Sequence, residues 1–141
     1  MPARNSYSHR TTVQKLGVAA DQRLEVAGDV GPGLRRDLKS ALGRGLVRSG
    51  ELDGAVVLVK SLDEARDALQ SYRPRLRDNG YLWIVTRKRG HDGYVNQMSL
   101  VPPAKELGLI DNKTCSIDDD RSAIRFVVPR ALRGARARSA A

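Results

Sequence analysis

The glycine-rich segment GDVGPG at residues 28–33 is the part of the chain best suited to bind a ligand. It lies between a short apolar stretch and a helical pattern, and backbone N–H groups at a helix start can bind a phosphate or a cofactor carboxylate. The candidate cofactor-binding residues are Gly28, Asp29, Gly31 and Gly33. The spacing matches neither G-x-G-x-x-G nor G-x-G-x-G, and Pro32 lacks a backbone N–H. We therefore favour a plain structural turn and keep a nucleotide site as the alternative.

A set of basic residues could form a positive rim near this loop for nucleic acid or another polyanion. They follow predicted strands or begin the predicted helix, so they would share the edge where open α/β sheets bind ligands. The candidate anion-binding residues are Arg35, Arg36, Lys60, Arg87, Lys88 and Arg89. Arg35 and Arg36 oppose the helix dipole, a conflict that a bound anion would relieve. The alternative, which we favour, is a solvated charged surface.

Residues able to act as nucleophile, base or metal ligand are few and scattered. Ser61 follows a strand pattern, but Glu64 completes a capping box with it, so we expect a helix cap and no nucleophile. Cys115 is the single cysteine, and the two histidines lie far apart in the sequence, which argues against a zinc site. The run Asp118-Asp119-Asp120 lacks the spacing of a calcium loop and is typical of a hairpin turn. We therefore expect no catalytic residue and no metal site.

The apolar patterns define the framework around these residues. The run at 55–59 is apolar at every position, as in a strand covered on both faces of a parallel sheet, and 81–85 is a second such run. The sequence predicts strands at 24–27, 55–59, 81–85, 110–117 and 122–128, a turn at 78–80, and helices at 34–46, from 61 to about 76, and at 102–107. This order indicates an α/β fold with one open, mostly parallel sheet and a C-terminal antiparallel hairpin.

Most of the net charge lies at the ends of the chain. The 141 residues suit one domain and carry a formal net charge of +9. Residues 1–15 hold three cations and residues 130–141 hold four, both without an acid. We expect a flexible N-terminus at 1–12, a folded domain at 13–130 and a basic disordered tail at 131–141. The single cysteine and the lack of an apolar leader or a long apolar run predict a cytoplasmic protein that does not use a membrane.

Several segments of the chain resemble a known family. They are Tyr7-Ser8, KLGV at 15–18, AVVLVKS at 55–61, NGYLW at 79–83, CSID at 115–118 and SAIRFV at 122–127. Over about residues 7–130 they are similar to short bacterial proteins, common in actinobacteria, that are filed as domain of unknown function 3052. The order of elements also resembles a truncated class I methyltransferase core. This resemblance implies a Rossmann-like sheet and makes S-adenosylmethionine a conceivable cofactor, which the altered glycine loop does not favour. It implies no activity, because the family has none established.

Three functions are open at this point. We favour a non-catalytic, Rossmann-like binding or regulatory protein, because the cofactor and catalytic motifs of the resembled fold are degenerate. A divergent S-adenosylmethionine-dependent methyltransferase is the first alternative. A nucleic-acid-associated protein that uses its basic termini is the second, since arginine contacts to phosphates confer affinity without reading a sequence.

Overall fold

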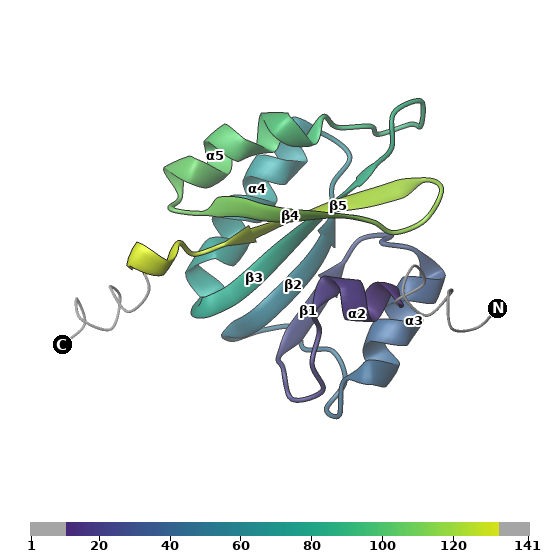
Figure 1. The fold of residues 1–141 in the computed structure, drawn as a ribbon, viewed down its shortest axis with the longest axis vertical. Coiled ribbons are helices and arrows are strands. Elements are labelled where there is room, and N and C mark those ends of the chain that lie inside the picture. The colour runs from purple at the N-terminus through teal and green to yellow at the C-terminus, as the bar shows by residue number, and fades with distance from the viewer. Residues whose placement is uncertain (1–10, 133–141) are drawn as a thin grey trace, which may run out of the picture.

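A computed structural model describes residues 11–132, which form one five-stranded sheet with helices on both faces (Figure 1). The strands are β1 (Leu24–Ala27), β2 (Leu52–Leu58), β3 (Leu76–Arg87), β4 (Ile110–Ser116) and β5 (Arg121–Val127), in the spatial order β1-β2-β3-β5-β4. The helices are α2 (Thr12–Leu16), α3 (Pro32–Ala41), α4 (Leu62–Tyr72) and α5 (Val101–Glu106), with short 3₁₀ turns at Arg73–Arg75, Gln97–Leu100 and Arg130–Leu132.

The strand pairing confirms the predicted fold class. β2 is parallel to both β1 and β3, and the register pairs Val56 with Trp83 and Val57 with Ile84. β5 is antiparallel to β3 and β4, so β4 and β5 form the closing hairpin. The continuous apolar runs of β2 and β3 are buried on both faces, as the sequence predicts for central strands.

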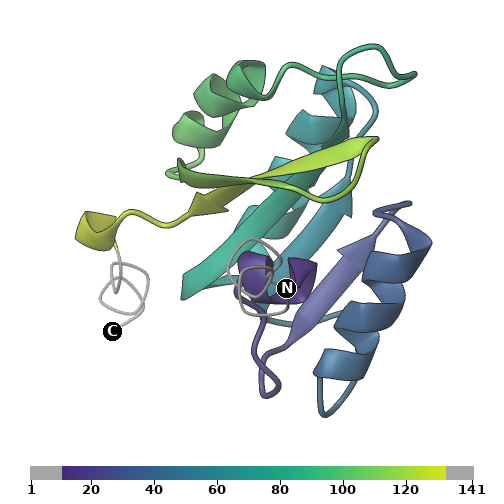
Figure 2. The same cartoon turned by 45° about the vertical axis from the view of Figure 1, so that its right-hand side comes forward.

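Two buried clusters, one on each face of the sheet, hold the helices in place. One cluster joins α4 and α5 to alternate strand residues such as Val57 and Ile84, and the other joins α2 and α3 to the intervening residues such as Val56 and Trp83. Figures 1 and 2 show these two helix pairs on opposite sides of the strands. Trp83 is fully buried, and its indole N–H donates to the Leu16 carbonyl at 2.9 Å, which fixes α2 against the sheet.

The connections after β1 and β2 leave the sheet on opposite faces. Because β1, β2 and β3 follow one another in one direction, two right-handed crossovers would place α3 and α4 on the same face. They pack on different faces, so the two crossovers have opposite hands. The carboxyl ends of β1 and β2 are therefore a topological switch point, which is where open α/β sheets bind ligands.

The helix predicted at 34–46 ends early, and its last turn was predicted wrongly. α3 stops at Ala41, and Leu42 is buried in an extended conformation. Gly43 and Gly45 follow, and Gly45 has a φ of +77°, which favours leaving the helix. The segment beyond it returns to β1, where the Val47 N–H donates to the Leu24 carbonyl at 2.9 Å. Residues 42–46 therefore leave the helix, although their apolar spacing also fits a helical period, because the chain here returns to pair with β1.

The turn predicted at 78–80 lies inside a strand. β3 begins at Leu76, and the pairing jumps from Leu52–Leu76 to Gly54–Tyr81, so the residues between bulge out of the ladder. A Cβ on Gly80 would lie 2.9 Å from the Arg77 carbonyl oxygen, so this bulge needs glycine. The residues Asp78-Asn79-Gly80 do bend the chain, as predicted, but the strand begins before them, at Leu76, and not after them.

The other predicted elements agree with the structure to within a few residues. β4 ends at Ser116, one residue before the predicted limit, and α5 begins at Val101, one residue early. Thr11 caps α2 and Thr12 begins it, inside the segment predicted as flexible; the rest of that segment, residues 1–10, and the tail from 133 lie outside the described residues. Within the described chain, no helix is long and apolar enough to span a bilayer.

Candidate functional site

The glycine loop lies at the switch point, directly after β1, and two of its glycines are required by the backbone. Gly28 has a φ of +79°, and a Cβ there would lie 3.1 Å from the Leu58 Cβ and 3.2 Å from the Leu58 carbonyl oxygen. Gly31 is the N-cap of α3 with a φ of +111°, and its N–H donates to Asp29 Oδ1 at 3.2 Å. At Gly33 a Cβ would meet only the end of the Arg36 side chain at 4.0 Å. Close packing and an Asx turn therefore account for the loop.

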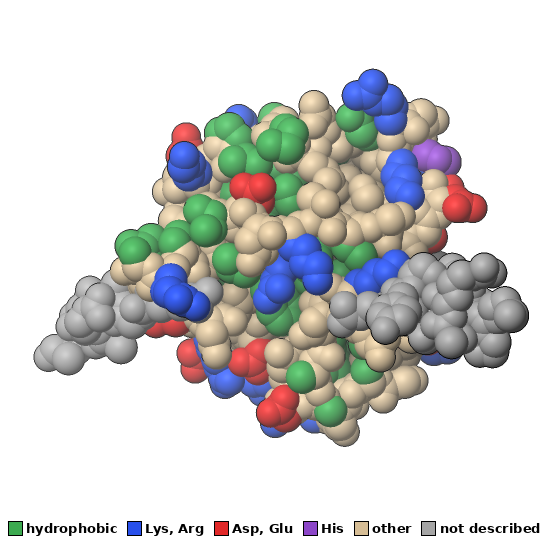
Figure 3. Space-filling model, in the orientation of Figure 1, with side chains coloured by type: hydrophobic (Ala, Val, Ile, Leu, Met, Phe, Trp, Pro, Cys, Tyr) green, Lys and Arg blue, Asp and Glu red, His purple; other side chains and the backbone are tan. Residues whose placement is uncertain are grey.

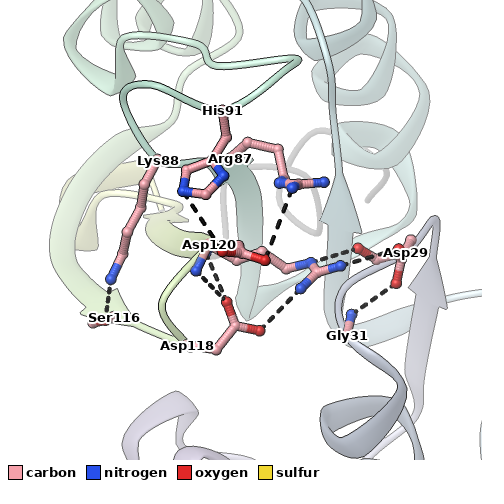
Figure 4. Close-up of polar contacts among 9 residues, drawn as sticks. Asp29, Gly31, Arg87, Lys88, His91, Ser116, Asp118 and Asp120 are labelled. Atoms are coloured by element: carbon pink, nitrogen blue, oxygen red, sulfur yellow. Dashed lines mark hydrogen bonds and ion pairs between the residues drawn. The ribbon is translucent and has the colours of Figure 1, made fainter.

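Arg121, at the start of β5, fastens the hairpin to this loop by bonds to Asp29 and Asp118, whose side chains Figure 4 shows. Its Nε donates to the Asp29 carbonyl at 3.0 Å, and its Nη2 to Asp29 Oδ2 at 3.0 Å. Its Nη1 donates to Asp118 Oδ2 at 3.0 Å. The other Asp118 oxygen accepts from the N–H groups of Asp120 and Arg121, both at 2.8 Å. The Arg121 side chain is only 11% exposed, so the hairpin covers it.

This contact stabilises the negatively charged form of Asp29 and the positively charged form of Arg121. The hydrogen bond from the Gly31 N–H and the positive charge of Arg121 lower the pKa of Asp29 below its ordinary value of 3.8. Burial alone would lower the pKa of Arg121, but its hydrogen bond with Asp118 and the charges of Asp118 and Asp29 raise it. Asp29 and Arg121 are therefore both held in their ionised forms at neutral pH.

The hairpin brings its own carboxylate to the start of α3. A Cβ on Gly31 would lie 3.5 Å from Asp118 Oδ2 and 3.9 Å from Arg121 Nη1. A negative charge at a helix N-terminus offsets the unfavourable cations of its first turn. Asp118 thus brings a negative charge of the chain itself close to the helix start, where the sequence analysis considered a bound anion only as an alternative. The sequence analysis gave Arg121 no role.

The structure separates the residues predicted to form a positive rim. Arg35 Nη1 donates to the Val26 carbonyl at 3.4 Å and, with Lys39 and Arg48, lines a cavity of about 220 Å³ beside β1. Arg36 lies beside Asp37, with 3.9 Å between Arg36 Nε and Asp37 Oδ1. In Figure 3 the Lys and Arg side chains on the visible face form several separate groups. Of the predicted set, Arg87, Lys88 and Arg89 remain together after β3, and Lys60 lies beside the same loop, since a Cβ on Gly93 would be 3.4 Å from the Lys60 Cβ.

Lys60 and Ser61 belong to the start of α4. The Ser61 hydroxyl accepts from the Glu64 N–H at 3.0 Å, which confirms the predicted cap. The reciprocal half of the predicted capping box is wrong, because Glu64 Oε1 accepts from the Lys60 N–H at 3.1 Å and not from the N–H of Ser61. Cys115 is buried, and desolvation raises the pKa of its thiol, so it is an unreactive core residue. Within residues 11–132 no three His, Cys, Asp or Glu side chains are grouped to hold a metal ion.

A second cavity lies at the carboxyl end of β3 and was not predicted. Its volume is about 280 Å³, and its lining residues are Thr86, Arg87, Lys88, Arg89, Tyr94, Val95, Asn96, Gln97, Met98 and Ser122. Gln97 Nε2 donates to Thr86 Oγ1 at 3.3 Å and to Ser122 Oγ at 3.2 Å, which holds the amide in place. The tyrosine that follows the basic loop was the available sequence signal, and only the fold shows that this ring is exposed.

Several solved structures share this fold at low sequence identity. A SAM-dependent methyltransferase from Aquifex aeolicus is 8% identical, with a TM-score of 0.62 over 92% of this chain and 99% of that chain. Magnesium protoporphyrin IX methyltransferase from Synechocystis PCC 6803, with bound SAH, is 9% identical, with a TM-score of 0.60 over 83% and 78% of the two chains. Fibrillarin from Aeropyrum pernix, with natively bound S-adenosyl-L-methionine, is 16% identical, with a TM-score of 0.52 over 77% and 67%. These similarities establish a Rossmann-like, methyltransferase-like fold.

Sequence comparison places the chain more specifically. A search of curated proteins finds no match. A family model described as protein of unknown function (DUF3052) matches residues 13–130, which is most of the chain. The matched range contains the glycine loop, the capped helix α4 and the whole closing hairpin. The chain belongs to the DUF3052 family.

Proposed function

We propose that this chain is a non-catalytic, Rossmann-like binding or regulatory protein whose switch-point loop is a structural joint. The contact of Arg121 with Asp29 and Asp118 supports this most strongly, because it places a hairpin of the same chain over the loop. The Asp29 carboxylate, carbonyl and Asx turn are already used within the protein. A cofactor that approached this loop would have to displace these contacts.

A divergent S-adenosylmethionine-dependent methyltransferase is the second candidate. The observation that favours it is the shared fold with proteins whose structures hold SAM or SAH. The switch point between β1 and β2 is also where ligands bind in open α/β sheets.

Calorimetric titration of the full chain with S-adenosylmethionine and with S-adenosylhomocysteine separates the two candidates. We expect no saturable heat from either compound. The Arg121→Ala variant, which frees the loop, and the Arg66→Ala variant, which removes one charge from an exposed position of α4 on the other face of the sheet, are titrated in parallel. Saturable binding to the wild-type chain, with shifts of the Gly28 and Gly31 amide resonances in NMR spectra, would overturn the structural role proposed for this loop. Binding to Arg121→Ala alone would support it, because the hairpin contact then excludes the cofactor.

A further inference from the structure

The cavity beside β1 gathers three cations and no acid. Its volume is about 220 Å³, and its lining residues are Val26, Arg35, Lys39, Leu46, Val47 and Arg48. β1 is the outer strand of the sheet and α3 runs beside it in Figures 1 and 2, so the cavity lies between this strand, the helix and the segment that follows the helix. Neither Gly28 nor Gly31 lines it, so this site is separate from the switch-point loop.

The helix and the returning segment each bring cations to this cavity. Arg35 and Lys39 lie four residues apart on α3, so their side chains share one face of the helix. Arg35 Nη1 donates to the Val26 carbonyl at 3.4 Å, which holds the guanidinium at the edge of the strand. Arg48 directly follows Val47, whose N–H is bonded to β1, so the pairing with this strand positions the third cation.

No carboxylate of the described residues neutralises these cations. Arg35 donates to a neutral carbonyl, and none of the three takes part in an ion pair within residues 11–132. The acids of α3 and β1 lie beside other cations: Asp37 is 3.9 Å from Arg36, and Glu25 is 2.7 Å from Arg75. Like charges four residues apart on a helix repel each other, so an anion between them would remove an unfavourable interaction.

The floor of the cavity is apolar. Val26 is buried, and Leu46 and Val47 are partly buried against the two core clusters. Charged contacts beside an apolar surface are less weakened by water than contacts on an open polar surface. This concave, apolar setting distinguishes the three cations from the solvated lysines and arginines that cover most protein surfaces.

We propose that this cavity binds one phosphate group, as inorganic phosphate or on a small phosphomonoester, between Arg35, Lys39 and Arg48. A guanidinium can donate two parallel hydrogen bonds to phosphate oxygens, and the lysine ammonium adds a point charge. The apolar floor would cover the carbon substituent of an ester.

The size of the cavity limits the ligand. Its volume of about 220 Å³ is below the range of about 300–1,000 Å³ that is usual for pockets of drug-sized ligands. One small anion suits this space, and a whole S-adenosylmethionine molecule does not. The proposal goes beyond the function argued above, since it concerns a different site and holds whether or not S-adenosylmethionine binds at the loop.

NMR titration of the full chain tests the proposal with two probes. Sodium phosphate and phenyl phosphate are added separately at neutral pH, with the ionic strength held constant by sodium chloride. We expect saturable shifts of the Arg35, Lys39 and Arg48 amide resonances with at least one probe. Tighter binding of phenyl phosphate, with shifts of the Leu46 and Val47 methyl resonances, identifies a phosphomonoester as the source of the phosphate group. Equal or tighter binding of inorganic phosphate identifies the free ion.

Substitutions assign the binding to this cavity. Lys39→Gln and Arg48→Gln should each weaken the affinity by about fivefold, the upper end for a charged contact at an exposed site. Both side chains are exposed and make no hydrogen bond within residues 11–132, so these variants should fold, which thermal unfolding in chloride checks. Arg66→Gln removes the same charge from an exposed position of α4 on the other face of the sheet and should leave the affinity unchanged.

Three results overturn the proposal. They are the absence of saturable shifts at these amides with both probes, equal affinity of the wild-type chain and the two cavity variants, and an equal loss of affinity in Arg66→Gln. The last result would show general attraction of anions by a basic protein instead of a site.

Discussion

Arg121 joins two segments that lie 92 residues apart in the sequence. The guanidinium uses three of its donors in a fixed fork, one set on the carbonyl and carboxylate of Asp29 and one on Asp118. Lysine cannot reproduce this geometry, because it offers a single ammonium in place of a planar fork. Beyond the pairing of β5 with β3, this one side chain makes the hydrogen bonds that tie the hairpin to Asp29 of the glycine loop.

The Asp29 carboxyl group reports directly on this contact. Its pKa in the folded protein lies below 3.8, so its ionised form adds stability that is present above that pH and is lost as the pH falls through the folded pKa. We expect an NMR titration of the Asp29 side-chain carbon to have a midpoint below 3.8 in the wild-type chain. In Arg121→Gln the midpoint should move upward, because a positive neighbour is lost. An unchanged midpoint would show that Arg121 does not contact Asp29 in solution.

Gly54 permits close packing of an aromatic ring on the sheet. A Cβ at this position would lie 2.3 Å from the Tyr81 ring, whose hydroxyl is held by a 2.7 Å hydrogen bond to Gln22. We expect Gly54→Ala to reduce the free energy of unfolding by about 1–3 kcal/mol, as overpacking does in a close-packed core. Gly43→Ala is the matched control, since its Cβ would meet its nearest neighbour at an ordinary 3.6 Å. Urea denaturation of both variants measures the difference, and equal stabilities would contradict this account of Tyr81.

At the scale of elements, the start of α4 depends on its cap. The Ser61 side chain satisfies the Glu64 N–H, and both Asp63 and Glu64 lie in the first turn, where negative charge is favourable. Ser61→Ala should destabilise the protein by about 1 kcal/mol. Ser40→Ala, in the exposed last part of α3, removes a hydroxyl that makes no cap and should not destabilise it. Thermal unfolding compares the two variants; if they lose equal stability, the cap is unimportant.

Elements with a strong local signal were predictable. β2 and the core of β3 are continuous apolar runs, and the acidic turn between β4 and β5 indicates a hairpin in any context. The last turn of α3 and the start of β3 were not predictable locally. In both places the local pattern fits more than one secondary structure, and pairing with a residue distant in sequence selects one of them. The Val47 segment pairs with Leu24, and Leu76 pairs with Leu52.

The residues of the candidate site also fall into those that the sequence identifies and those that only the structure reveals. Sequence reasoning found the glycine loop and the basic run Arg87–Arg89, because glycines and cations are visible as residue types. It missed the Arg121 contact and the exposure of Tyr94, which depend on how the hairpin and the loop after β3 pack. It also grouped Arg35 with the rim, although that side chain lies beside β1.

At the scale of the whole molecule, the arginine-rich end contributes charge outside the described fold. Arg133, Arg136 and Arg138 lie beyond residue 132. If the basic termini contact nucleic acid, as proposed for one candidate function, replacing these three arginines by glutamine should reduce the steepness of log affinity against log salt by about 2 for a single strand. Titrations of labelled oligothymidylate at several salt concentrations measure this slope. An unchanged slope would show that these three arginines do not contact the nucleic acid.

The segment that returns along β1 has a consequence for how this fold can grow. The Arg23 carbonyl accepts from Asp53 and Gly54, so the next carbonyl, on Leu24, points away from β2 to the free side of the sheet, where Val47 meets it. The Val47 N–H and the Arg35 side chain therefore satisfy the Leu24 and Val26 carbonyls on this free edge, where an unpaired strand would otherwise invite aggregation. An inserted strand–helix unit between Ala41 and Leu52 would widen the sheet outward while leaving the β2-β3-β5-β4 half unchanged. In this chain the sheet ends at β1, and strands added by such an insertion would lie beyond that edge.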